Sequence, residues 1–281
     1  MRDYRYRLVN VFAEAPLEGN PLCVFEDARG LDDATMQALA LQFNLSETTF
    51  ILPSAEASAH VRIFTPTFEM PFAGHPTLGT AHVVRELRRT GDALTLQMRA
   101  GIIAVSAAGD RWTLTAQPPR SRQAGVDRDR LARYLRLAPG DIGEQPLWID
   151  TGSEQLIVPL NSVDAVRRAD PDAGMVAEWP RNGLARAMLY VWSRIDASNV
   201  DARFFFTKHA SVLEDPGTGS ACANLGGWMV ATRQSLPVDV VVHQGEAVGR
   251  RCRLGLRVAA EGAITVSGRV IELGSGTIRL D

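Results

Sequence analysis

The sequence is poor in the residues on which several common enzyme chemistries depend. Lys208 is the only lysine, so there is no phosphate-binding Gly-Lys-Ser/Thr loop, and a pyridoxal enzyme would have a single Schiff-base candidate. A Gly-x-Gly-x-x-Gly dinucleotide fingerprint and a His-Glu-x-x-His zinc pattern are both missing. His75 and His82 could share a helix face, but no third metal ligand is evident in the sequence. These absences favour a reaction that needs neither a cofactor nor a metal.

Cysteine, long apolar runs and excess charge are also scarce. Cys23, Cys222 and Cys252 are scattered and odd in number, which argues against a disulfide framework or a thiolate metal site. No apolar run approaches the ~20 residues that span a bilayer, and no apolar signal segment follows residues 1–7. The net charge is −2, so no basic field predicts binding to nucleic acid or to a membrane. We therefore expect a cytoplasmic protein with neither partner.

What the sequence does contain is a motif repeated at an offset of 140 residues, half of the chain length. Each copy ends in a glycine-rich turn that opens a helix, at residues 74–81 and 214–221. The pairs that match at this offset are Phe64 and Phe204, His75 and Asp215, Pro76 and Pro216, Gly79 and Gly219, and Thr80 and Ser220. We predict two similar halves, each with a helix N-terminus whose free N–H groups suit an anion. If these ends face each other, a small acid can bind between them; the alternative is chance likeness of two turns.

The hydrophobic patterns predict an α+β fold, in which each half is a mostly antiparallel β-sheet around one central helix. Strands are predicted over 4–12, 22–25, 48–52, 60–65, 94–98, 102–106, 111–116, 147–150, 155–159, 187–193, 202–206, 238–243, 252–258, 263–266 and 269–280, and helices over 32–43, 76–89 and 218–232. The last helix is apolar nearly all round and should be buried. Residues 117–121 read as a linker. The expected domains are therefore 1–118, to which strand 269–281 can return, and 119–268.

Glu47 stands out between the predicted helix 32–43 and the next strand. It is a lone carboxylate with polar neighbours on one side and an apolar strand on the other. It could be an ordinary solvated loop residue. It could also be a general acid/base whose protonated form is favoured by apolar surroundings, with Ser46 as the hydrogen-bond partner that orients it.

These motifs together resemble the PhzF-like (phenazine biosynthesis) isomerases. The residues that carry the resemblance lie in the same order along the whole chain, at 19–21, 44–48, 72–81, 214–221, 244–245 and 249–250. The resemblance implies the diaminopimelate epimerase fold, with two pseudo-symmetric halves, a site in the cleft between them, and a homodimer. The type enzyme of the family isomerises trans-2,3-dihydro-3-hydroxyanthranilate without a cofactor, and one glutamate moves the proton.

The resemblance also implies roles for particular residues. It gives the proton transfer to Glu47 and supporting acid/base or orienting roles to His75 and Asp215. The residues that it places around the substrate are Asn20, Ser46, Gly74, Gly219 and Ser220. Without the resemblance, His75 would be an ordinary polar residue in a turn, and Asp215 a helix cap before a proline. We expect Asp215 to be both a cap and a site residue, whereas Ser220 and Thr80 could simply bond backbone within their own turns.

Two departures from related patterns limit the assignment. Epimerases of this fold carry a catalytic cysteine at each helix end, and the resemblance places Gly74 and Asp215 at those positions, so a two-thiol racemase mechanism is excluded. Residues 249–252 read Gly-Arg-Arg-Cys where a Gly-Arg-Pro-Ser run is expected. We predict a cofactor-independent isomerase of a small carboxylate-bearing substrate. The alternatives are an epimerase or racemase of a small acid, and a non-catalytic small-acid binding protein on the same fold.

Overall fold

A computed structural model describes residues 1–89, 91–208 and 211–280 of the chain. The chain divides into two compact units: unit 1 comprises Met1–Thr115 and Ser267–Asp281, and unit 2 comprises Ala116–Val266. The boundaries expected from the sequence, after residues 118 and 268, lie three and two residues beyond the observed ones. In the described parts of the chain, no helix combines the length and the hydropathy that a membrane crossing requires.

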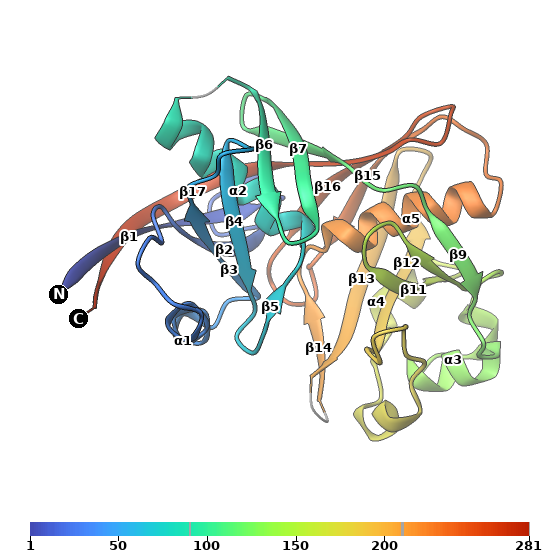
Figure 1. Cartoon of the computed structure of the whole chain (residues 1–281). Coiled ribbons are helices and arrows are strands. Elements are labelled where there is room, and N and C mark those ends of the chain that lie inside the picture. The colour runs from blue at the N-terminus through green and yellow to red at the C-terminus, as the bar shows by residue number, and fades with distance from the viewer. Residues whose placement is uncertain (90, 209–210, 281) are drawn as a thin grey trace. The chain divides into compact units, whose positions relative to one another are not determined.

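Unit 1 is a mixed sheet with two helices packed against its strands (Figure 1). Its elements are β1 (Arg2–Val11), β2 (Asn20–Phe25), α1 (Asp33–Phe43), β3 (Glu47–Leu52), β4 (Ala59–Phe64), β5 (Glu69–Met70), α2 (Gly74–Arg88), β6 (Ala93–Met98), β7 (Gly101–Ala108), β8 (Arg111–Thr115) and most of β17 (Ile264–Leu280). The pairs β2–β3 and β4–β6 are parallel, and β1–β2, β3–β4 and β6–β7 are antiparallel. The segment Val270–Leu280 of β17 pairs antiparallel with β1 along the whole length of β1.

Helix α1 determines where Glu47 lies. The side chain of Asp32 accepts a hydrogen bond from the Thr35 amide (2.8 Å) and begins the helix, as the sequence predicts. Asn44, with φ of 51°, ends it in the left-handed conformation. The apolar face of α1 packs on a core cluster that includes stacked Phe25 and Phe50. Strand β3 begins shortly after α1 ends, and Glu47 is its first residue.

Helix α2 lies in the core of unit 1, against β1, β2, β3 and β8. It begins at Gly74, two residues before the predicted start at Pro76. The difference has a physical reason: the first helical N–H groups have no intrahelical acceptor, so a proline without an N–H is tolerated at the third position. Consequently Gly74 and His75 belong to the first turn of the helix. All residues from 74 to 84 are buried.

Unit 2 repeats the arrangement with extra short helices. Its elements are β9 (Arg120–Gln123), α3 (Arg128–Tyr134), η1 (Pro139–Asp141), β10 (Leu147–Asp150), β11 (Glu154–Pro159), α4 (Val163–Arg168), η2 (Ala173–Glu178), β12 (Met188–Arg194), β13 (Asn199–Lys208), β14 (Ser211–Asp215), α5 (Gly219–Ala231), β15 (Val238–Gln244) and β16 (Cys252–Val258). The linker expected at 117–121 overlaps strand β9, which pairs with β10. Helix α5 is almost wholly buried against β9, β10, β11 and β16.

The two units share one strand order. In unit 2 the pairs β11–β12 and β13–β15 are parallel, and β10–β11, β12–β13 and β15–β16 are antiparallel, which repeats the sequence of pairs in unit 1. Strands β4 and β13 begin 140 residues apart, at Ala59 and Asn199. The helices that follow begin 145 residues apart, at Gly74 and Gly219. The pairing of His75 with Asp215 is therefore wrong at the helix starts, because unit 2 has a longer hairpin there.

The last strand differs from its prediction in an informative way. Two strands, 263–266 and 269–280, were expected on either side of Gly268, whereas β17 runs unbroken through this glycine. A Cβ atom at Gly268 would lie 2.2 Å from Cδ1 of Phe12. Glycine is present there because a buried aromatic ring packs directly on the backbone, and the strand does not turn.

Candidate active site

The predicted site residues of unit 1 meet at one end of α2. Glu47 is the first residue of β3, Asn20 is the first residue of β2, and His75 is the second residue of α2. The Nε2 atom of His75 lies 3.4 Å from Oε2 of Glu47. The Nδ2 atom of Asn20 lies 3.3 Å from Nδ1 of the same ring. The side chains of His75 and Glu47 are only 6% and 15% exposed, so the cluster is largely shielded from water.

The buried position of His75 determines its charge. Burial lowers the pKa of His75 from its ordinary 6.5 to about 3, and a hydrogen bond with the backbone of Pro21 opposes that effect without reversing it. The imidazole is therefore neutral at physiological pH. Its contact with Glu47 is between a neutral ring and a carboxyl group, and it is not an ion pair.

The first turn of α2 begins without a side-chain cap. The residue before the helix is Ala73, which has no side chain that could cap it, so the amides of Gly74 and His75 are not capped from that position. Ser46 is exposed in the bend that leads into Glu47. Of the predicted unit 1 residues, Glu47, His75 and Asn20 are joined by side-chain contacts, and Gly74 precedes His75 in the helix.

The predicted acid of unit 2, Asp215, ends β14 and does not cap α5. The N-cap residue is Thr218, so the expected capping role of Asp215 is wrong. The hydroxyl of Thr218 donates a short hydrogen bond to Oδ2 of Asp215 and does not cap the helix. The buried amide of Gln244 holds both residues: its Nε2 donates to the Asp215 carbonyl (2.9 Å) and to Oγ1 of Thr218 (3.1 Å). Its Oε1 accepts from the Thr218 amide (3.4 Å).

The residues after Gln244 explain why the turn at 215–218 is tightly packed. Gly245 has φ of +82°, and a Cβ atom there would lie 2.5 Å from the Pro216 carbonyl oxygen and 2.2 Å from that of Arg250. Only glycine fits both the conformation and the space. The amide of Arg250 in turn donates to the Gly245 carbonyl (2.9 Å). The 249–252 segment, which departs from the expected motif, thus closes a loop against this glycine before β16 begins at Cys252.

Ser220, the second residue of α5, is held by a chain of buried amides. The Nε2 atom of Gln155 donates to Oγ of Ser220 (2.9 Å). The Oε1 atom of Gln155 accepts a short hydrogen bond from Nδ2 of Asn224. Asn224 is fully buried one turn further along α5. The Ser220 hydroxyl of helix α5 is therefore bonded to a side chain of strand β11, and not to the backbone of its own turn.

Sequence reasoning did not identify Gln155 or Asn224. A signal was available for Asn224, because it is an amide within a helix that is otherwise apolar enough to be predicted as buried. A buried amide needs hydrogen-bond partners, and so it points to a polar network. Gln155 gave no such signal, because it follows Glu154 at the polar start of strand β11, before the apolar run begins.

The three cysteines are packed thiols. Cys23, Cys222 and Cys252 are all buried and form no disulfide. Burial raises the pKa of the Cys23 and Cys222 thiols well above the ordinary value. Neither provides a thiolate at neutral pH, in agreement with the prediction that they are small packed side chains.

A further group of possible metal ligands lies on the far part of α2. His82, Glu86 and Glu272 bring one ligand atom each within 4.8 Å of one another. The guanidinium of Arg7, however, donates to both Glu86 and Glu272. The cation that these two carboxylates bind is thus a side chain of the protein itself.

Comparisons with known proteins agree with these features. The family model described as phenazine biosynthesis-like protein, PhzC-PhzF, matches residues 9–276. The chain belongs to the PhzF family. It is 39% identical to an uncharacterized isomerase of Pasteurella multocida, over 99% of this chain and 95% of that protein. It is 32% identical to the trans-2,3-dihydro-3-hydroxyanthranilate isomerase of Pseudomonas aeruginosa, over 97% of this chain and 98% of that one.

The fold is shared with solved members of the PhzF family. The crystal structure of a PhzF-family phenazine biosynthesis protein from Bacillus anthracis superimposes with a TM-score of 0.86, at 24% identity and full coverage of both chains. The predicted α+β fold is therefore confirmed. Because the curated relatives are named isomerases, this PhzF protein is an isomerase as well.

Proposed function

We propose that this PhzF-family isomerase moves a proton between two carbons of a small unsaturated acid of the trans-2,3-dihydro-3-hydroxyanthranilate type, with Glu47 as general acid/base. Relatives with that named activity match nearly the whole chain. The observation that carries the proposal is the contact between Glu47 and the buried, neutral His75. It supports a role for this carboxylate in chemistry, where a solvated loop glutamate would have no such partner.

The neutral state of His75 matters for the strength of the base. A cation beside a carboxylate stabilises the ionised form and makes it a poorer proton acceptor. A neutral imidazole can hold the carboxyl group in place without that electrostatic cost. His75 is therefore proposed to position Glu47, while Asn20 fixes the ring from the other side.

The proposed reaction conserves every atom. The Glu47 carboxylate takes a proton from one substrate carbon, and the electron pair left behind is delocalised over the conjugated system. The protonated Glu47 then returns a proton to another carbon of that system. One carboxyl group suffices for both steps, and neither an oxidant nor a co-reactant is required. The amides of the first turn of α2, which carries His75, would stabilise the negative charge that develops.

The predicted site residues of unit 2 form a second group, with polar side chains at Asp215 and Ser220. Asp215 is held by Thr218 and Gln244, and Gly219 and Ser220 open helix α5. We propose an orienting or acid/base role for Asp215 and binding roles for Gly219 and Ser220, as the resemblance implies. The homodimer and the absence of a cofactor also stay predictions, which sedimentation and assays with the metal-free protein would test.

The experiment that tests the proposed function follows the transferred proton. The protein is incubated with trans-2,3-dihydro-3-hydroxyanthranilate in D2O, and the acid is followed by proton NMR. We expect an isomerised product with deuterium at the carbon that receives the proton. Recovery of the same acid, labelled and inverted at one carbon, would instead identify an epimerase. Unchanged and unlabelled acid, with calorimetry reporting binding, would favour the binding-protein alternative.

A further inference from the structure

The orientation of the Asn224 side chain is determined by backbone groups of unit 2. Its Oδ1 accepts from the Thr151 amide (2.9 Å) and from the Thr151 hydroxyl (2.7 Å). Its Nδ2 donates to the Ser153 carbonyl (2.7 Å). A backbone N–H can only donate and a carbonyl can only accept. The two ends of the Asn224 amide are therefore distinguished by their partners, and the side chain has one possible orientation.

This orientation is passed on to Gln155. The Nδ2 atom of Asn224 also donates to Gln155, so the atom that faces it must be the amide oxygen of Gln155. The amide nitrogen of Gln155 then points the other way, to Oγ of Ser220 at 2.9 Å. Gln155 is 2% exposed, so water does not compete for these bonds.

The hydroxyl of Ser220 is consequently an acceptor toward Gln155. A hydroxyl has one proton and two lone pairs, and the Gln155 amide nitrogen has only protons to offer. The proton of Ser220 must therefore point elsewhere. Among the described residues, Gln155 is the one hydrogen-bond partner of this hydroxyl. Ser220 is half-buried and lies in the first turn of α5, whose N-cap side chain does not cap the helix.

We propose that Gln155, fixed by Asn224, positions the Ser220 hydroxyl as a hydrogen-bond donor to the acid group of the substrate. This inference rests on the proposed function, which takes a small acid as the substrate. Gln155 and Asn224 do not touch the acid. They favour binding of an anion because they direct the proton of the Ser220 hydroxyl away from Gln155. That proton lies next to helix amides that carry partial positive charge.

A double-mutant cycle in the full-length protein tests the proposal. The probe is 3-hydroxyanthranilate, the aromatic analogue of the dihydro acid, and its binding is measured by calorimetry without turnover. Ser220→Ala should weaken binding about 10- to 100-fold, the usual worth of a hydrogen bond to a charged group. Gln155→Leu should weaken it by a similar factor. Adding Gln155→Leu to Ser220→Ala should cause no further loss, because the two residues act through one hydroxyl.

Two further measurements separate positioning from mere support of the fold. Gln155→Glu changes one donor into an acceptor of the same shape, so Ser220 would turn its proton inward, and binding of the acid should be at least as weak as with Gln155→Leu. The neutral analogue 3-hydroxyanthranilamide should bind wild type and Gln155→Leu with similar affinity. Equal weakening of the acid and the amide would overturn the proposal, as would additive losses in the cycle.

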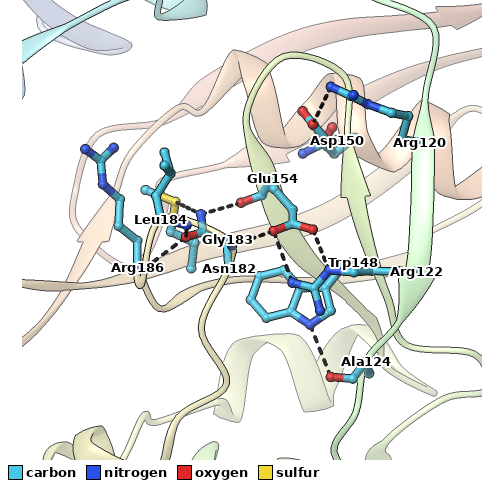
Figure 2. A network of polar contacts seen from close by, with 12 residues as sticks. Arg120, Arg122, Ala124, Trp148, Asp150, Glu154, Asn182, Gly183, Leu184 and Arg186 are labelled. Carbon is cyan, nitrogen blue, oxygen red and sulfur yellow. Dashed lines mark hydrogen bonds and ion pairs between the residues drawn. The ribbon is translucent and has the colours of Figure 1, made fainter.

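Asn182 provides a matched control, because it is another buried amide of unit 2 (Figure 2). It donates to the Glu154 carbonyl (3.0 Å) and accepts from the amides of Leu184 and Arg186. Glu154 itself is held by Arg122 (2.6 Å) and by the Gly183 amide. Asn182→Ala should lower stability and leave the affinity for the acid unchanged.

The outcomes distinguish this proposal from the proposed function. If wild-type protein binds the acid with coupled Ser220 and Gln155 but never isomerises it, the proposed function fails and the positioning role stands. If it isomerises the acid and the cycle shows no coupling, the positioning role alone fails.

Discussion

The Nε2 atom of His75 lies 3.4 Å from Oε2 of Glu47, and burial keeps that imidazole uncharged. His75 lies in the first turn of α2, and Glu47 is the first residue of β3. The packing of the surrounding helices fixes the position of both residues. The rigidity of both elements means that the carboxyl group is presented in a defined direction, as a proton-transfer group requires.

The first prediction concerns Glu47. Glu47→Gln keeps the size and shape of the side chain and removes the proton acceptor, so kcat should fall by about 10²- to 10⁴-fold. Affinity for 3-hydroxyanthranilate should change much less, because the amide still fills the same space. Exchange of substrate protons with D2O is the measurement, on protein shown to be folded by circular dichroism. Wild-type exchange in this variant would mean that Glu47 is not the base.

The second prediction concerns the pH dependence of stability. The folded pKa of His75 is lowered to about 3 from an ordinary 6.5, so the unfolded chain binds a proton that the folded chain does not. Stability from this residue is complete above pH 6.5 and is lost as the pH falls toward 3. At pH 5 the loss relative to pH 7 should be about 2 kcal/mol.

Urea unfolding at pH 5 and pH 7 measures this effect in wild type and in His75→Asn. His82 and His243, whose pKa values burial also lowers, titrate in both proteins and cancel in the comparison. The free energy of unfolding should depend less steeply on pH in the variant. Parallel curves for the two proteins would show that folding does not lower the pKa of His75.

The third prediction concerns the thiols. Because Cys222 is fully buried in α5 and burial raises its thiol pKa, Cys222→Ala should retain turnover and lose some stability through the space left unfilled. Cys23→Ala is expected to behave in the same way. Steady-state assays on the folded variants give the answer. A decrease in kcat of more than ~100-fold, the scale of an acid/base group, would point to thiol chemistry instead.

Much of the fold could be predicted from local patterns in the sequence. The cap at Asp32 and the strand alternation gave α1 and most strands because each depends on neighbouring residues. Helices α3 and α4 were missed because they have only seven and six residues, too few for a hydrophobic period to emerge. Their start signals, the capping side chains of Asp127 and Ser162, were present in the sequence.

What could not be predicted depends on contacts between distant residues. Gly268 looks like a strand break until Phe12, at the other end of the chain, is seen to pack on it. The bond between Gln155 and Ser220 joins residues 65 positions apart. For Asp215, a proline at the next position suggests a helix start. The helix begins instead at Gly219, so the N-cap residue is Thr218.

The last prediction concerns Gln244, which ties Asp215 to Thr218. The amide of Gln244 binds the Asp215 carbonyl and the Thr218 hydroxyl, and the latter in turn donates to the Asp215 carboxyl group. Gln244→Leu removes both hydrogen bonds of the Gln244 amide nitrogen and should lower the free energy of unfolding by about 1–3 kcal/mol. Because the Thr218 hydroxyl then loses its fixed direction, kcat should also fall, by about 10-fold on the scale of one hydrogen bond of this strength. The same substitution at exposed Gln234, whose amide bonds only the nearby Thr232 hydroxyl in the described residues, is the control and should affect neither quantity. Loss of stability in Gln244→Leu with wild-type kcat would mean that Asp215 needs no orientation for the reaction, and its proposed role would then be untenable.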